Sequence, residues 1–131
     1  MINESIFRFL SKAQFLVLIV IYFWMGIANV AGTPAENIND LVMHAAGYFI
    51  AMFSGFCAFH SIKRFWYLLI GLWLFSLMIE LIQYYLPWRS FSVSDLIANL
   101  GGLLGGYVLI LLFKVHLLKI IEKISSQSTK A

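Results

Sequence analysis

A small set of ionisable and polar side chains stands within or beside long apolar segments of this chain. Many of them are three or four residues apart, which places them on one face of a helix. Carboxylates beside a histidine can transfer protons or bind a divalent metal, and an arginine can hold a phosphate with paired hydrogen bonds. Eight such residues form the candidate polar pocket: Asp40, His44, Tyr48, Glu80, Gln83, Arg89, Asp95 and Asn99.

Most of these residues also have a purely structural interpretation. Asp40 and Asp95 stand where helices are expected to begin, and a carboxylate there caps free N–H groups and meets the positive end of the helix dipole. The run from Ser92 to Asp95 resembles a capping box. Gln83 and Asn99 could join neighbouring helices by hydrogen bonds. Capping and chemistry therefore stay open as alternatives at both aspartates.

Glu80 and Arg89 fit a structural interpretation less well. Glu80 caps no expected helix and lies inside an apolar segment, where an ionisable residue is a functional candidate by default. Arg89 follows Pro87 in a short connection. There it could pair with Glu80 or Asp95, or present its guanidinium to a phosphate.

The elements that position these residues are four apolar segments, each long enough to cross a bilayer as a helix of about 20 residues. Hydrophobic residues make up 62% of the 131 residues and charged residues 11%. A soluble domain of this size could not bury so much apolar surface. The sequence predicts one all-α domain over residues 1–131, a four-helix transmembrane bundle with helices at about 13–31, 41–59, 65–86 and 93–113.

The lysines and arginines predict the orientation of the bundle. In an even-numbered bundle all of them except Arg89 fall on one side, and that side is expected to be cytoplasmic. Both termini should then be cytoplasmic, and the polar pocket should face outward from the outer half of the membrane. The residues from Lys114 onward predict a short amphipathic C-terminal tail. The residues on the inner side are Arg8, Lys12, Lys63, Arg64, Lys114, Lys119, Lys123 and Lys130.

The remaining composition narrows the class of function. The net charge of +3 comes from basic residues beside the apolar segments, which contact lipid headgroups, so we expect no nucleic-acid partner. The single cysteine, Cys57, lies within an apolar segment and is interpreted as a small buried residue. Four glycines at GxxxG spacing predict close helix packing in the last segment: Gly101, Gly102, Gly105 and Gly106.

Four short motifs follow one another along the chain: Asp40-x-x-x-His44-x-x-x-Tyr48, Glu80-x-x-Gln83, Pro87-x-Arg89 and Asp95-x-x-x-Asn99-x-Gly101. Together they resemble the VanZ-like family of small multi-pass membrane proteins, over about residues 40–112. The chain departs from the family at Leu41, where a lysine is common, so no role that needs a cation there is carried over. The resemblance implies a bacterial cytoplasmic membrane protein. The founding member of the family is associated with low-level resistance to teicoplanin.

Three functions fit these observations. The sequence favours a cell-envelope protein that binds or modulates an amphiphile or a lipid-linked molecule in its outward-facing pocket. An intramembrane acid–base or metal-dependent enzyme acting on a lipid-linked substrate is the alternative, but no familiar nucleophile, metal or phosphate motif supports it. We therefore expect neither a metal nor another cofactor. The third function is a structural one, in which the protein supports a membrane partner or a second copy of itself.

Overall fold

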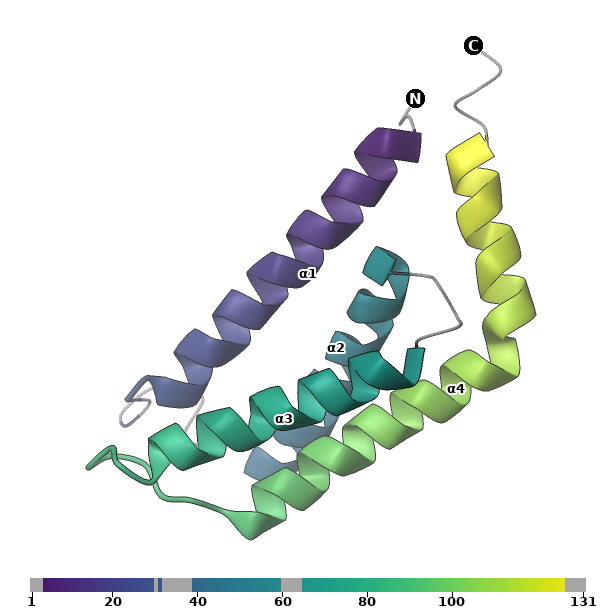
Figure 1. The fold of residues 1–131 in the computed structure, drawn as a ribbon. Helices are drawn as coiled ribbons and strands as arrows, with labels where there is room; N and C mark the ends of the chain where they lie inside the picture. Colours follow the sequence, from purple (N-terminus) through teal and green to yellow (C-terminus); the bar gives the residue numbers. More distant parts are fainter. Residues whose placement is uncertain (1–3, 30, 32–38, 60–64, 127–131) are drawn as a thin grey trace.

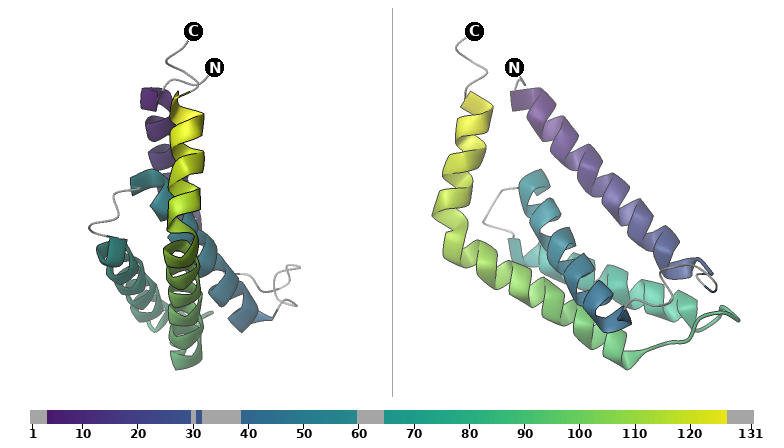
Figure 2. Two further views of the ribbon diagram at one scale, coloured as in Figure 1. Left: turned by 90° about the vertical axis from the view of Figure 1, so that its right-hand side faces the viewer. Right: turned by 180° about the vertical axis from the view of Figure 1, so that it is seen from behind.

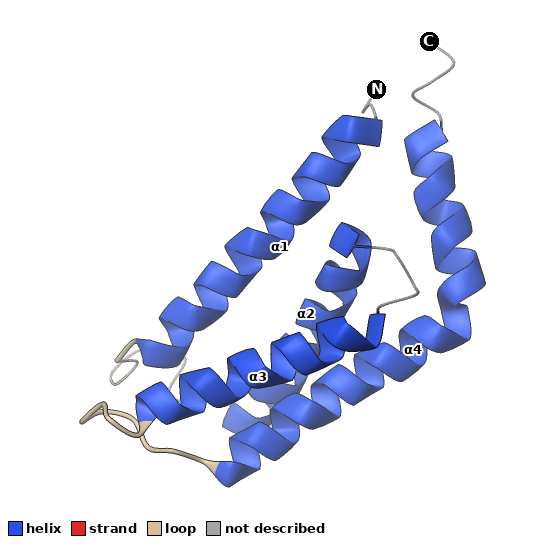
Figure 3. Cartoon of the chain, in the orientation of Figure 1, coloured by secondary structure: helices blue, strands red, loops and turns tan. Residues whose placement is uncertain are grey.

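The computed structural model describes residues 4–29, 31, 39–59 and 65–126, and the described part of the chain contains helices and no strands (Figures 1 and 3). All four helices are long and apolar enough to cross a membrane, which confirms the predicted all-α bundle. The helices are α1 (Glu4–Ile27), α2 (Asp40–Phe59), α3 (Phe65–Gln83) and α4 (Val93–Ser126).

The ends of the helices differ from the ends of the apolar segments. Helix α1 begins at Glu4 rather than near residue 13, and it ends at Ile27. Apolar sequence marks the part of a helix that lipid surrounds, whereas backbone hydrogen bonds continue through the polar residues that flank it. The hydropathy pattern therefore locates a membrane span better than it locates the first turn of a helix.

Helix α3 stops at Gln83, before the predicted end at residue 86. The backbone N–H groups of Tyr85 and Leu86 donate to the carbonyls of Ile82 and Gln83, at 3.0 Å each, so the chain closes in tight turns. Pro87 then disfavours a helical conformation in the residue before it. These two features end the helix ahead of the apolar segment.

The predicted tail after Phe113 is part of α4, which continues to Ser126 and bends in its second half (Figures 1 and 2). A straight helix of this length would measure about 50 Å at 1.5 Å per residue, well beyond a hydrocarbon core of about 30 Å. The part of α4 after Phe113 carries the exposed His116 and Lys119, polar residues that are typical of a membrane surface.

Helices α2 and α4 form the most extensive contact in the bundle. The core between them contains Tyr48, Met52, Phe56 and Leu103, all at most 6% exposed. Many large apolar side chains on the outer faces of the helices are exposed instead. This distribution suits a bundle surrounded by lipid and agrees with a multi-pass membrane protein.

The first turn of α1 and the last turn of α4 lie at the same end of the molecule (Figures 1 and 2). An even number of crossings requires this arrangement, but it does not say which side of the membrane the termini occupy. Their cytoplasmic location stays a prediction from the positive-inside rule.

Cysteine labelling in intact cells tests the orientation. In a Cys57→Ala background, Ser90→Cys lies in the connection between α3 and α4 and should react with a membrane-impermeant maleimide from outside. Lys119→Cys replaces an exposed residue of α4 after Phe113 and should react only after the membrane is permeabilised. The reverse labelling pattern would overturn the predicted orientation.

Candidate functional site

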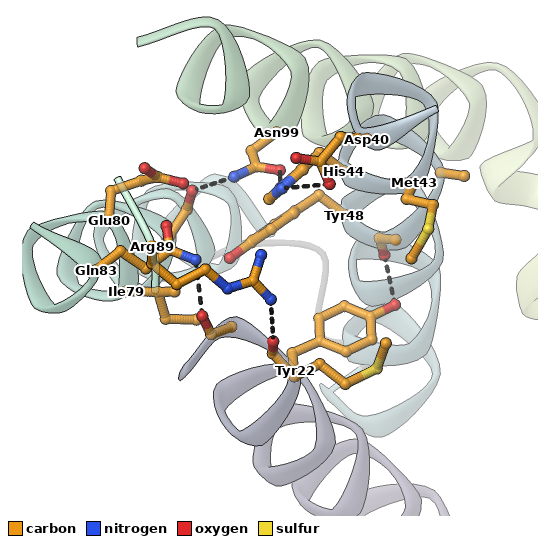
Figure 4. A pocket seen from close by; sticks show the side chains of 15 residues that line it. Tyr22, Asp40, Met43, His44, Tyr48, Ile79, Glu80, Gln83, Arg89 and Asn99 are labelled. Atoms are coloured by element: carbon orange, nitrogen blue, oxygen red, sulfur yellow. Dashed lines mark hydrogen bonds and ion pairs between the residues drawn. The ribbon is translucent and has the colours of Figure 1, made fainter. Parts of the chain in front are cut away.

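A partly open cavity of about 330 Å³ lies between the helices at the end of the bundle where α2 and α4 begin (Figure 4). All four helices and the connection after α3 contribute to its walls. Every residue of the predicted polar pocket lines this cavity except Asp95, which contacts the His44 side chain beside it. Sequence reasoning did not place Tyr22, Met25, Met43 or Ile79 there.

His44 is the centre of the polar cluster. Its Nδ1 atom lies 2.9 Å from Oδ1 of Asn99, and the Asn99 amide donates to Oγ of Ser76 at 2.6 Å. Its Nε2 atom lies 3.6 Å from a carboxylate oxygen of Asp40 and 3.6 Å from one of Asp95. The imidazole is therefore fixed on one side by a buried amide and faces two carboxylates on the other.

Neither aspartate provides the side-chain cap of its helix. At the start of α2, the backbone N–H of Val42 donates to Oδ1 of Asn39 at 3.2 Å. At the start of α4, the N–H of Asp95 donates to Oγ of Ser92 at 3.2 Å. In both cases the residue directly before the helix, Asn39 or Ser92, occupies the N-cap position. This leaves the carboxylates of Asp40 and Asp95 free to face His44.

Glu80 completes the cap of α4. Its Oε2 atom accepts a hydrogen bond of 3.0 Å from the N–H of Ser92. In a capping box that N–H would bond to the acidic side chain three residues later, here Asp95. Glu80 takes the place of Asp95 in this arrangement, so the expectation that Glu80 caps nothing is wrong.

Arg89 pairs with the end of α1 rather than with a carboxylate. Its guanidinium donates to the carbonyls of Ala28 (3.2 Å) and Met25 (3.0 Å). Two other side chains continue the pattern: Gln83 donates to Gly26 at 2.8 Å and Trp88 donates to Ile27 at 3.0 Å. Because the last carbonyls of a helix have no partner within it, these three side chains together cap the C-terminus of α1.

Neither interpretation of Arg89 from the sequence anticipated this cap. The acceptors are backbone carbonyls, which every residue carries, so they leave no signal in the residue types. Trp88 takes part through its indole N–H. The connection between α3 and α4 therefore contributes Arg89 to the cavity wall and fastens α1 to the bundle.

A family of known proteins shares the part of the chain that contains the polar cluster. The family model described as VanZ/LLP1 matches residues 3–114. The chain belongs to the VanZ/LLP1 family. No curated protein and no solved structure matches it. In this VanZ/LLP1 protein the match ends at Lys114, so it covers the four predicted spans and the whole polar cluster but not the last part of α4.

Two of the four glycines in α4 lie directly against α2. A Cβ atom at Gly102 would collide with the backbone carbonyl of Ala45, and one at Gly106 would lie 3.0 Å from Cβ of Met52. Gly101 has no neighbour within 4 Å, and Gly105 has one ordinary contact at 3.7 Å. In the VanZ/LLP1 chain the close approach of α2 and α4 thus depends on Gly102 and Gly106.

Helix α1 contributes one further polar contact to the cavity wall. The Tyr22 hydroxyl donates to the carbonyl of Gly47 at 2.8 Å, and a Cβ at Gly47 would touch that hydroxyl at 3.5 Å. Near the middle of α1, the Gln14 side chain accepts a hydrogen bond of 2.8 Å from the hydroxyl of Ser54. The VanZ/LLP1 cavity therefore has polar links to α1 on its rim, and Gln14 lies outside it.

Proposed function

We propose that this VanZ/LLP1 protein binds the headgroup of an amphiphilic or lipid-linked molecule of the bacterial cell envelope in an outward-facing pocket. One observation carries the proposal: a cavity with an ionisable wall opens between membrane-spanning helices. Polar groups in such a position are costly and are found mainly where they serve a pathway or a ligand.

The lining of the cavity is mixed in chemistry. Asp40, His44, Glu80 and Asn99 contribute charged and polar groups, and Met25, Met43 and Ile79 contribute apolar ones. Figure 4 shows Met43 beside Asp40 and His44, and Ile79 beside Glu80. A headgroup in the cavity would therefore meet polar partners and apolar side chains together, while its chain stays outside in the lipid.

The volume favours a headgroup over a whole lipid. Ligand cavities usually measure about 300–1,000 Å³, and this one is at the lower limit with about 330 Å³. A polyisoprenoid or acyl chain could not fit inside. It would stay in the bilayer against the exposed apolar faces of the helices.

The cavity offers complementary groups to such a headgroup. Arg89 uses two of its five N–H groups on α1, which leaves donors for an anionic group. One oxygen of Glu80 accepts from Ser92, and its second oxygen has no hydrogen bond from the described residues. Carboxylates with free oxygens bind hydroxyls and amines, so the site suits a headgroup that carries both phosphate and hydroxyl or amino groups.

A bulky substitution at an apolar residue of the lining tests the pocket. Met43→Trp should fill the cavity and reduce the amount of co-purified amphiphile at least tenfold, measured by native mass spectrometry of gently extracted protein. The matched control is Val42→Trp, which adds the same side chain to the neighbouring residue on the lipid-facing side, where Val42 is 61% exposed.

The Val42→Trp protein should retain as much co-purified amphiphile as the wild type. Equal retention by Met43→Trp and Val42→Trp, or wild-type protein without any bound amphiphile, would contradict the proposal.

A further inference from the structure

We infer that Asp40, His44 and Asp95 form a binding site for one divalent transition-metal ion, with an open side toward the cavity. Among the described residues these three are the group whose nitrogen and oxygen atoms lie close enough to share an ion, all within 4.8 Å of one another. Asp40 and His44 lie in the first two turns of α2 and Asp95 in the first turn of α4, so an ion would also join the two helices.

The orientation of the imidazole supports this assignment. Nδ1 lies 2.9 Å from Oδ1 of Asn99, an oxygen that only accepts, so this contact is a hydrogen bond in the tautomer with the proton on Nδ1. The Asn99 amide nitrogen in turn donates to Oγ of Ser76 at 2.6 Å. In that neutral tautomer Nε2 bears the lone pair, and it faces Asp40 and Asp95. A second hydrogen bond that orients the ligating histidine is the usual arrangement at metal sites.

The distances fit a shared ion better than direct hydrogen bonds. Nε2 lies 3.6 Å from each carboxylate, beyond the usual range of about 2.7–3.2 Å for an N–H···O bond. Ligand atoms about 2.0–2.2 Å from a zinc ion at tetrahedral angles are about 3.3–3.6 Å apart. The two separations from His44 therefore match two edges of a coordination tetrahedron, and the ligand atoms of Asp40 and Asp95 lie within 4.8 Å of each other.

A separate observation points into the same space. Glu80 is 1% exposed and lines the cavity, yet one of its two oxygens has no hydrogen bond from the described residues. That oxygen is not among the fully buried side-chain atoms that lack a partner, so it is accessible from the cavity and can accept a further hydrogen bond. A metal-bound water or the ligand of the cavity would supply the missing donor. Glu80 would then lie outside the three ligands, on the open side of the ion.

The ion would also change what the cavity can bind. Three carboxylates stand near one guanidinium here, so two negative charges lack a counter-charge when His44 is neutral. A divalent ion balances them, and an anionic headgroup could then bind between the ion and Arg89. This last role rests on the proposed function, whereas occupancy of the site by an ion does not.

Metal binding is measured on the full chain in detergent, without added lipid. Protein stripped with EDTA is titrated with Zn²⁺ by calorimetry, and Co²⁺ serves as a spectroscopic probe of coordination. We expect one Zn²⁺ per chain and a Co²⁺ absorption spectrum of a four-coordinate site. His44→Gln and Asp95→Asn should each weaken Zn²⁺ binding at least tenfold.

Matched controls are available on the later part of α4. His116→Gln and Glu122→Gln remove an exposed imidazole and an exposed carboxylate outside the cluster and should leave the affinity unchanged. Circular dichroism checks that each variant is folded. If His44→Gln fails to fold, the Co²⁺ spectrum of the wild type decides by itself.

Two results would overturn the inference. The first is the absence of stoichiometric Zn²⁺ binding, which would mean that a protonated His44 balances the carboxylates as an ion pair instead. The second is Zn²⁺ binding that survives both His44→Gln and Asp95→Asn. Loss of bound amphiphile in Met43→Trp is a separate measurement, so the proposed function and the metal site can fail independently.

Discussion

Arg89→Ala is expected to loosen α1 from the bundle and to lower the free energy of unfolding by about 2–3 kcal/mol. The substitution leaves two carbonyls at the end of α1 without their donor. Hydrogen bonds to a charged group contribute about 1.5–3 kcal/mol each in proteins. The contribution is smaller in a membrane, because the unfolded state also finds hydrogen-bond partners there. Thermal unfolding in detergent, followed by circular dichroism, gives the change. Hydrogen exchange in α1 should rise at the same time.

Two substitutions separate capping from charge. Arg89→Lys keeps the positive charge, but an ammonium cannot reproduce the fork that spans Ala28 and Met25, so it should lose most of the same stability. Lys119→Ala removes an exposed cation from α4 and should change stability by no more than about 0.5 kcal/mol. An Arg89→Ala protein as stable as the wild type would show that Arg89 does not hold α1 in place.

Gly102→Ala and Gly101→Ala should change stability in opposite directions. At Gly102 the new methyl group would collide with the carbonyl of Ala45, and a backbone atom cannot move aside as a side chain can. We expect a loss of about 1–3 kcal/mol, the usual cost of overpacking. At Gly101 the methyl group has no neighbour within 4 Å, and alanine favours the helix by up to about 1 kcal/mol.

The same pair of variants tests the geometry of the polar cluster. Ala45 follows His44 on α2, and Gly102 lies two turns after Asp95 on α4. Pushing the helices apart at Gly102 should therefore separate His44 from Asp95 and weaken Zn²⁺ binding, while Gly101→Ala should not. Equal behaviour of the two variants, in stability and in Zn²⁺ affinity, would show that the contact of Gly102 with α2 is unimportant.

The bundle could be predicted from the sequence because every membrane span must be both apolar and helical. The four segments therefore stand out by hydropathy alone. The spacing of His44, Glu80 and Asn99 also placed them at one end, and the structure brings them to one cavity. What hydropathy cannot report is where a helix ends among polar residues, as at Glu4 and Ser126.

The partners of the polar residues were harder to predict than their location. Arg89 and Glu80 bond to backbone groups, of α1 and of Ser92, and no residue type marks those groups. The glycine pattern contains two overlapping GxxxG pairs, and only the rotation of α4 decides which pair meets α2. Such choices depend on how the helices pack together, which the pattern of one helix does not contain.

The hydrogen bond between His44 and Asn99 joins residues 55 positions apart in the chain. At a synthesis rate of about 5–20 residues per second, the ribosome makes the histidine about 3–11 s before the asparagine that orients it. During this interval α2 has no α4 beside it, and Asp40 and His44 have neither Asn99 nor Asp95 as neighbours. The nascent chain must therefore keep the start of α2 near water or polar headgroups until its last helix has entered the membrane.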